Sequence, residues 1–193
     1  MRDEARLPLP REIFDGLAEA TRRFGSFGVN KYRNEKEVTE ATLSFFYDLS
    51  VNYGYTIRDK HRKGEFLKID HLWFKDDSIV LAMEHENTAG RRATGRFQVV
   101  YDELKKLANV KAHLKVLITY DSVEKERREL MEQAKSLLRS NHIRLDDETY
   151  LIIIGAKGEG FGLDDPYIRY FGFFLDNRGE ILETYSLENI LIE

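Results

Sequence analysis

The chain contains no cysteine among its 193 residues. Disulfide bonds, zinc–thiolate sites and cysteine nucleophiles are therefore excluded together, and the absence fits a reducing compartment. No apolar run approaches the roughly 18 residues that a membrane helix needs. The opening sequence MRDEARLPLP also lacks the apolar segment of a signal peptide. We therefore expect a cytoplasmic protein that does not enter a membrane.

Apolar residues are nonetheless plentiful. The sequence is 42% hydrophobic and 33% charged, with 10 Tyr and 12 Phe. This composition can bury a core and argues against intrinsic disorder, and the length suits one domain. The formal net charge of −4 argues against a generic basic protein that coats nucleic acid. A local basic patch can still bind phosphates.

The order of periodic segments predicts an α/β fold with a mixed sheet. A short amphipathic stretch before Gly25 predicts a peripheral helix, and apolar residues at helical spacing from Val38 to Leu49 predict a longer one. Three strand-like runs follow as a meander: YTIRDK, FLKIDHLWF and SIVLAMEHE. Two helix–strand units come next, with strands HLKVLITY and YLIIIGA, and then a hairpin that turns at residues 177–179.

Acidic residues on two neighbouring strands form the most informative pattern. Asp70 lies on the second strand of the meander, and Glu84 and Glu86 share one face of the third because side chains alternate. A three-residue loop at residues 76–78 would set Asp70 opposite Glu84, whereas a two-residue loop would place them on opposite faces. Carboxylates that lie close together repel one another and are tolerated mainly when a cation neutralises them. Ligands that are all oxygen select Mg²⁺, Mn²⁺ or Ca²⁺. Such an ion would activate water for phosphodiester hydrolysis.

The stretch from Asn34 to Tyr120 resembles the PD-(D/E)XK nuclease superfamily. The shared order is a helix carrying Glu, a meander with Asp on its second strand and an acidic pair ending its third, and then a helix and a strand. LKID contains Asp70, and AMEHEN contains Glu84. The resemblance implies a restriction endonuclease-like three-layer sandwich with a central mixed sheet. It also implies an Mg²⁺- or Mn²⁺-dependent endonuclease that hydrolyses DNA in restriction, repair or recombination.

The resemblance also assigns roles to single residues. Asp70, Glu84 and Glu86 are the implied metal ligands and catalytic carboxylates, and Glu86 stands where the family usually carries a Lys. Glu35, on the first core helix, is the fourth implied catalytic residue. Three auxiliary residues complete the predicted site: Lys68, Gln98 and Glu37.

Within a single domain over residues 1–193 we expect three parts. Residues 1–33 form a peripheral segment, residues 34–120 form the nuclease-like core, and residues 121–193 complete the sheet with a helix, a strand and the hairpin.

Two basic clusters flank the acidic strands. Their residues are Arg58, Lys60, Arg62, Lys63, Arg91, Arg92 and Arg96. Cations beside an acidic pocket would draw an anionic backbone across carboxylates that otherwise repel it. DNA is therefore the expected partner, with RNA as a second candidate. Because cutting both strands usually needs two active sites, a homodimer is a further prediction.

Two other interpretations stay open. The missing family Lys also fits a noncatalytic member of the same fold that binds nucleic acid or protein. Alternatively, the carboxylates form only salt bridges in an unrelated α/β protein.

Overall fold

The computed structural model describes residues 7–22, 31–59, 69–86, 96–121, 124–141, 146–156 and 169–186. The helices within these ranges are α1 (Pro10–Arg22), α2 (Lys31–Asn52), α3 (Arg96–Ala108) and α4 (Glu124–Ser140). The strands are β1 (Thr56–Asp59), β2 (His71–Lys75), β3 (Ser78–His85), β4 (Leu114–Asp121), β5 (Thr149–Ala156), β6 (Arg169–Asp176) and β7 (Ile181–Ser186). None of these described helices is long and apolar enough to cross a membrane.

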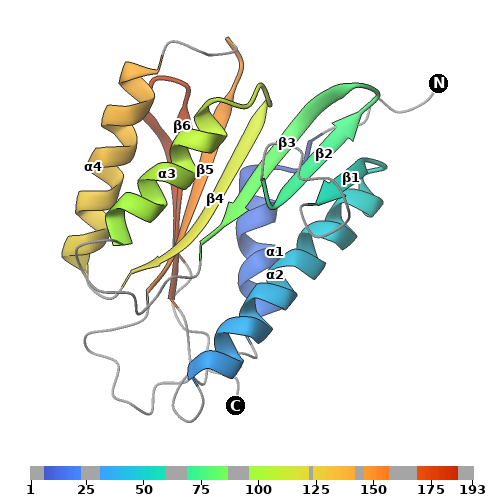
Figure 1. The fold of residues 1–193 in the computed structure, drawn as a ribbon, viewed down its shortest axis with the longest axis horizontal. Coiled ribbons are helices and arrows are strands. Elements are labelled where there is room, and N and C mark those ends of the chain that lie inside the picture. Colours follow the sequence, from blue (N-terminus) through green and yellow to red (C-terminus); the bar gives the residue numbers. More distant parts are fainter. Residues whose placement is uncertain are drawn as a thin grey trace.

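The seven described strands form one mixed sheet, ordered β1 to β7 as in the sequence (Figure 1). Strands β1 to β3 are an antiparallel meander, and β6 and β7 form an antiparallel hairpin. Between them β3, β4 and β5 run parallel, because α3 and α4 each cross back before the next strand begins. The mixed α/β class is thus confirmed, as are the meander and the terminal hairpin. The restriction endonuclease-like assignment is not confirmed by this topology.

Helices cover both faces of the sheet, with α1 and α2 on one face and α3 and α4 on the other (Figure 1). Strand β4 shows why, since it is apolar on both sides: Val116 and Ile118 pack with the α1 and α2 residues, whereas Leu117 packs with those of α3 and α4. Such strands are typical of parallel sheets buried on both faces. Helix α1 belongs to the core rather than to a peripheral segment, because Ile13 and Phe14 are completely buried.

The β2–β3 hairpin decides on which face the acidic residues lie. Asp76 and Asp77 form a two-residue turn, and Lys75 pairs with Ser78 across it. Asp76 has a φ of 54°, in the left-handed region that Asp tolerates better than most residues. With a regular ladder, this short turn would place Asp70 and Glu84 on opposite faces.

A β-bulge reverses that outcome. Phe74 pairs with Ile79, but its neighbour Trp73 pairs with Leu81, so Val80 is an extra residue on β3. One inserted residue exchanges the two faces for everything beyond it. The short turn and the bulge together give the alignment that was expected of a three-residue loop.

Candidate acidic site at the end of β3

Glu84 and Asp70 lie next to each other on the α3 side of the sheet. Glu84 is near the end of β3 and only 2% exposed, and Asp70 directly precedes β2 and is 5% exposed. Because His71 pairs with Met83 and the pairing is antiparallel, Asp70 is level with Glu84. The two carboxyl groups interact by a hydrogen bond that requires a proton on one of them.

The backbone of β3 favours the ionised form of Asp70. The His85 N–H donates to Asp70 Oδ2 at 2.8 Å. A hydrogen bond to a carboxylate stabilises its charged form. The shared proton is therefore expected on Glu84 rather than on Asp70.

Helix α3 supplies the other charged groups of the site. Lys106 Nζ lies 3.1 Å from Glu84 Oε1 and also forms an ion pair with Glu103. No well-aligned hydrogen bond reaches Glu84 Oε1, so we describe its contact with Lys106 by the distance between the two atoms alone. Glu103 and Lys106 are three residues apart and therefore lie on one face of the helix.

The charges at this site do not balance, because Asp70, Glu84 and Glu103 bring three carboxyl groups and Lys106 brings one ammonium group. Burial is the largest cause that raises the pKa of Glu84, followed by the charges of Asp70 and Glu103, and the pKa reaches about 9 although Lys106 acts in the opposite direction. A carboxylic acid with such a pKa is protonated at neutral pH. We refer to Asp70, Glu84, Glu103 and Lys106 as the acidic site.

Among the predicted site residues, the structure brings Asp70 and Glu84 together. Glu86 follows β3 directly, is half-buried, and donates its backbone N–H to the Ile118 carbonyl at 2.8 Å. Gln98 is exposed and donates to Asp102 at 2.9 Å along α3, so it does not belong to the acidic site.

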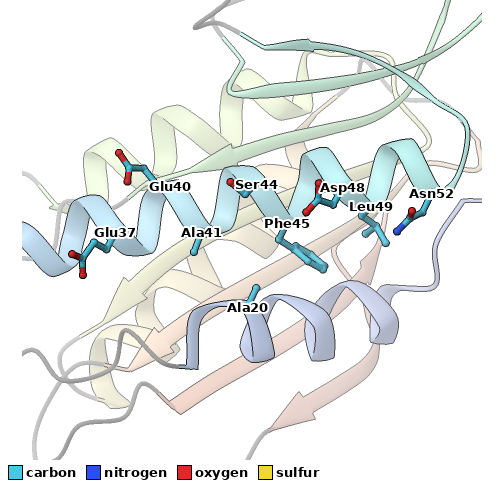
Figure 2. Close-up of a pocket in the computed structure, with 9 residues that line it drawn as sticks. All are labelled: Ala20, Glu37, Glu40, Ala41, Ser44, Phe45, Asp48, Leu49 and Asn52. Carbon is cyan, nitrogen blue, oxygen red and sulfur yellow. The ribbon is translucent and has the colours of Figure 1, made fainter.

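Glu37 lies elsewhere. It lines a groove between α1 and α2, on the sheet face opposite α3 (Figure 2). Its predicted auxiliary role therefore stays a prediction.

Most of the predicted basic residues fall outside the described part of the chain. These are Lys60, Arg62, Lys63, Arg91 and Arg92, and Lys68 lies outside it as well. Glu35 and Arg96 belong to α2 and α3, but their side chains are not among those described. Arg58 is exposed on β1, with its guanidinium 4.5 Å from the centre of the Phe74 ring. Binding of DNA or RNA and a homodimer therefore stay predictions.

Glu103 and Lys106 were not predicted from the sequence. Their signal is the i, i+3 spacing beside the buried Leu104 and Leu107 of α3. That spacing places both charges at the border of the apolar face, but only the packed structure shows that this border meets Glu84.

Within the described ranges, no group of three His, Cys, Asp or Glu side chains is arranged to hold a metal ion. The ammonium of Lys106 already lies at ion-pair distance from Glu84, so a divalent ion would compete with it for that oxygen. Magnesium or manganese binding at Asp70, Glu84 and Glu86 stays a prediction.

The sequence matches no family model and no curated protein. Among solved structures, the fold is similar to a carbon-nitrogen hydrolase from Helicobacter pylori G27, with a TM-score of 0.43 and 11% sequence identity. The similarity covers 85% of this chain and 69% of that one.

The assignment to the PD-(D/E)XK superfamily is corrected: no family model matches the chain, and the solved structure named above is a carbon-nitrogen hydrolase and not a nuclease. The DNA endonuclease activity and the role in restriction, repair or recombination are withdrawn with it. The physical reason is that an Asp and two Glu on adjacent strands also suit a site compensated by a proton and Lys106. At this TM-score and identity, the neighbour's own activity is not transferred to this chain.

Proposed function

We propose that the protein is a hydrolase in which Glu84 acts as a general acid. The observation that carries the proposal is the acidic site itself, where a buried Glu84 with a pKa of about 9 contacts an Asp70 held by the His85 N–H. Two neighbouring titratable groups whose environments separate their pKa values are typical of acid–base catalysis. A proton donor that stays protonated at neutral pH can protonate a leaving group.

We assign a separate role in hydrolysis to each of three residues of the acidic site. Glu84 gives its proton to the departing oxygen or nitrogen, while water attacks the electrophilic centre and later returns a proton to Glu84. The positive charge of Lys106 stabilises negative charge that develops on a substrate oxygen. Glu103 holds Lys106 in place through their ion pair. No covalent intermediate on cysteine is available, because the chain has no cysteine.

A buried ion pair elsewhere in the protein provides a comparison, because its charges have a purely structural arrangement. Lys115 and Glu148 are 0% and 2% exposed, with 2.9 Å between Nζ and Oε2, and Tyr150 contacts both. Its single positive and single negative charge compensate each other in an enclosed place. The acidic site differs in both respects, since it keeps an excess of carboxyl groups and Lys106 is 36% exposed.

The test compares substrates whose leaving groups differ in their need for a proton. Purified protein is assayed with paired p-nitrophenyl and alkyl esters, and with anilides, between pH 5 and pH 10. We expect Glu84→Gln to lower the rate about 100-fold or more where the leaving group is an alkoxide or an amine. The loss should be much smaller for p-nitrophenolate, which leaves without protonation. The parent's rate should fall as the pH rises through about 9.

Glu132→Gln is the matched control, because Glu132 is an exposed residue of α4 that pairs with Lys135 on its own helix. It should leave all rates unchanged. Equal rates for Glu84→Gln and the parent on every substrate, or no hydrolysis by the parent, would contradict the proposal.

A further inference from the structure

A line of hydrogen-bonding side chains begins on the opposite sheet face, directly behind the acidic site. His85 is half-buried at the end of β3, and its Nε2 lies 3.1 Å from the hydroxyl of Tyr120 on β4. The two rings meet edge to face with their centres 5.7 Å apart. Tyr120 is 2% exposed, so its hydroxyl has little access to bulk water.

The line continues into α1. Tyr120 is hydrogen-bonded to Tyr170 of β6. The hydroxyl of Tyr170 in turn lies 2.9 Å from Thr21 Oγ1, near the end of α1. Buried polar groups in such a chain hold one another in place, because any group that loses its partner is left unsatisfied in a dry environment.

His85 belongs to both this line and the acidic site. Its ring points toward Tyr120, while its backbone N–H donates to Asp70 Oδ2. His85 is also the last residue of β3, and β2 begins only at His71, so Asp70 lies beyond the β2–β3 ladder. Beyond the end of that ladder, the His85 peptide group is held by its pairing with Ile118 of β4 and by the contact of the His85 ring with Tyr120.

We propose that Tyr120 is a positioning residue of the acidic site, which holds the His85 ring from the opposite face of the sheet so that the His85 N–H stays on Asp70. This inference rests on the proposed function for its catalytic meaning. Tyr120 touches none of the reacting groups and acts only through His85.

The experiment measures the His85 amide directly in ¹⁵N-labelled protein, as its proton chemical shift and its hydrogen-exchange rate. Asp70→Ala sets the values for a lost hydrogen bond. We expect Tyr120→Phe to move the His85 resonance toward those values and to speed its exchange about tenfold. The Met83 amide, within the β2–β3 ladder, reports general loosening of β3 and should change much less.

Tyr170→Phe is the matched control, because it removes the same hydroxyl one step farther along the line. It should leave the His85 amide within about twofold of the parent. An unchanged His85 amide in Tyr120→Phe, or equal effects of both Tyr substitutions, would overturn the inference. The pKa of Glu84 in the parent separates the two proposals: a value near 4.5 rejects the proposed function, whereas a value near 9 with an unmoved His85 rejects only the role of Tyr120.

Discussion

Glu84 and Asp70 have the same functional group and nearly the same burial, yet their surroundings differ in kind. Asp70 accepts a backbone N–H, which favours its ionised form, whereas Glu84 faces two other carboxyl groups in a desolvated position. Lys106 offsets part of this cost but is shared with Glu103. The environment thus favours the ionised form of Asp70 and the protonated form of Glu84.

Replacing Asp70 with Asn tests this separation. Asp70→Asn removes a negative charge beside Glu84 but keeps an oxygen that can accept the His85 N–H. We expect the pKa of Glu84 to fall, and the variant to be no less stable than the parent at pH 8 in EDTA. Chemical denaturation measures the free energy of unfolding.

Asp70→Ala is the matched comparison, since it also removes the acceptor. It should be about 1–3 kcal/mol less stable than Asp70→Asn, because the His85 N–H loses its partner. If the Asn variant is as unstable as the Ala variant, the ionised Asp70 stabilises the fold and the repulsion argument is wrong.

At this scale the sequence showed Asp70 and Glu84 because strand alternation is a local property. It did not show Glu103 and Lys106, whose place depends on how α3 is rotated against the sheet. The resemblance named Gln98 as an auxiliary residue, but its side chain donates to Asp102 on the exposed side of α3.

Among the elements, the β2–β3 hairpin shows how two local features combine. The turn is two residues long, which by itself predicts the wrong faces, and the bulge at Val80 restores the alignment of Asp70 with Glu84. Turn residues are visible in a sequence, whereas a bulge inside an apolar run such as SIVLAM leaves no clear signal. The alternatives for the hairpin could therefore be stated from the sequence but not decided.

The packing of α1 on β6 gives a prediction about the fold. A Cβ atom on Gly172 would lie 2.7 Å from Phe14 Cδ2 and 2.9 Å from Tyr185 Cδ2. Both rings are buried, so neither can move freely. We expect Gly172→Ala to lower the free energy of unfolding by about 1–3 kcal/mol, measured by denaturant titration.

The double variant Phe14→Leu/Gly172→Ala provides the control. Its loss of stability should be smaller than the sum of the two single losses, because the smaller Leu leaves room for the new methyl group. Strict additivity would show that the close approach of α1 to β6 is not the cause.

The proton on Glu84 should make the free energy of unfolding of the whole protein depend on pH. The pKa of Glu84 is raised from 4.5 to about 9 on folding, so between these values the folded state binds more protons than the unfolded state. Linkage then requires the stability contributed by this group to be complete below about pH 4.5 and to be lost as the pH rises to about 9. The direction is opposite to that of an ordinary salt-bridged carboxylate.

Glu84→Gln isolates this contribution. The amide cannot ionise, so the free energy of unfolding of the variant should depend less on pH. Between pH 5 and pH 9 we expect the parent's free energy of unfolding to fall by at least about 2 kcal/mol more than that of the variant. Denaturant unfolding at several pH values measures the difference, with Glu132→Gln as the control that should follow the parent. Parallel stability curves for parent and Glu84→Gln would exclude a raised pKa.

The sequence was most informative for the molecule's general architecture. The mixed sheet, the meander and the terminal hairpin follow from periodicity and turn residues, which are local. The function inferred from the resemblance was wrong, because acidic residues on adjacent strands do not specify whether a metal ion, a proton or a lysine compensates them. That choice depends on burial and on α3, which are properties of the folded chain.

The most direct test of the account is an NMR titration of the Glu84 side-chain carboxyl carbon in ¹³C-labelled parent protein, assigned by comparison with Glu84→Gln. This carbon should titrate with a midpoint near pH 9. A midpoint near 4.5, the ordinary value for Glu, would contradict both the shared proton and the general acid that depends on it.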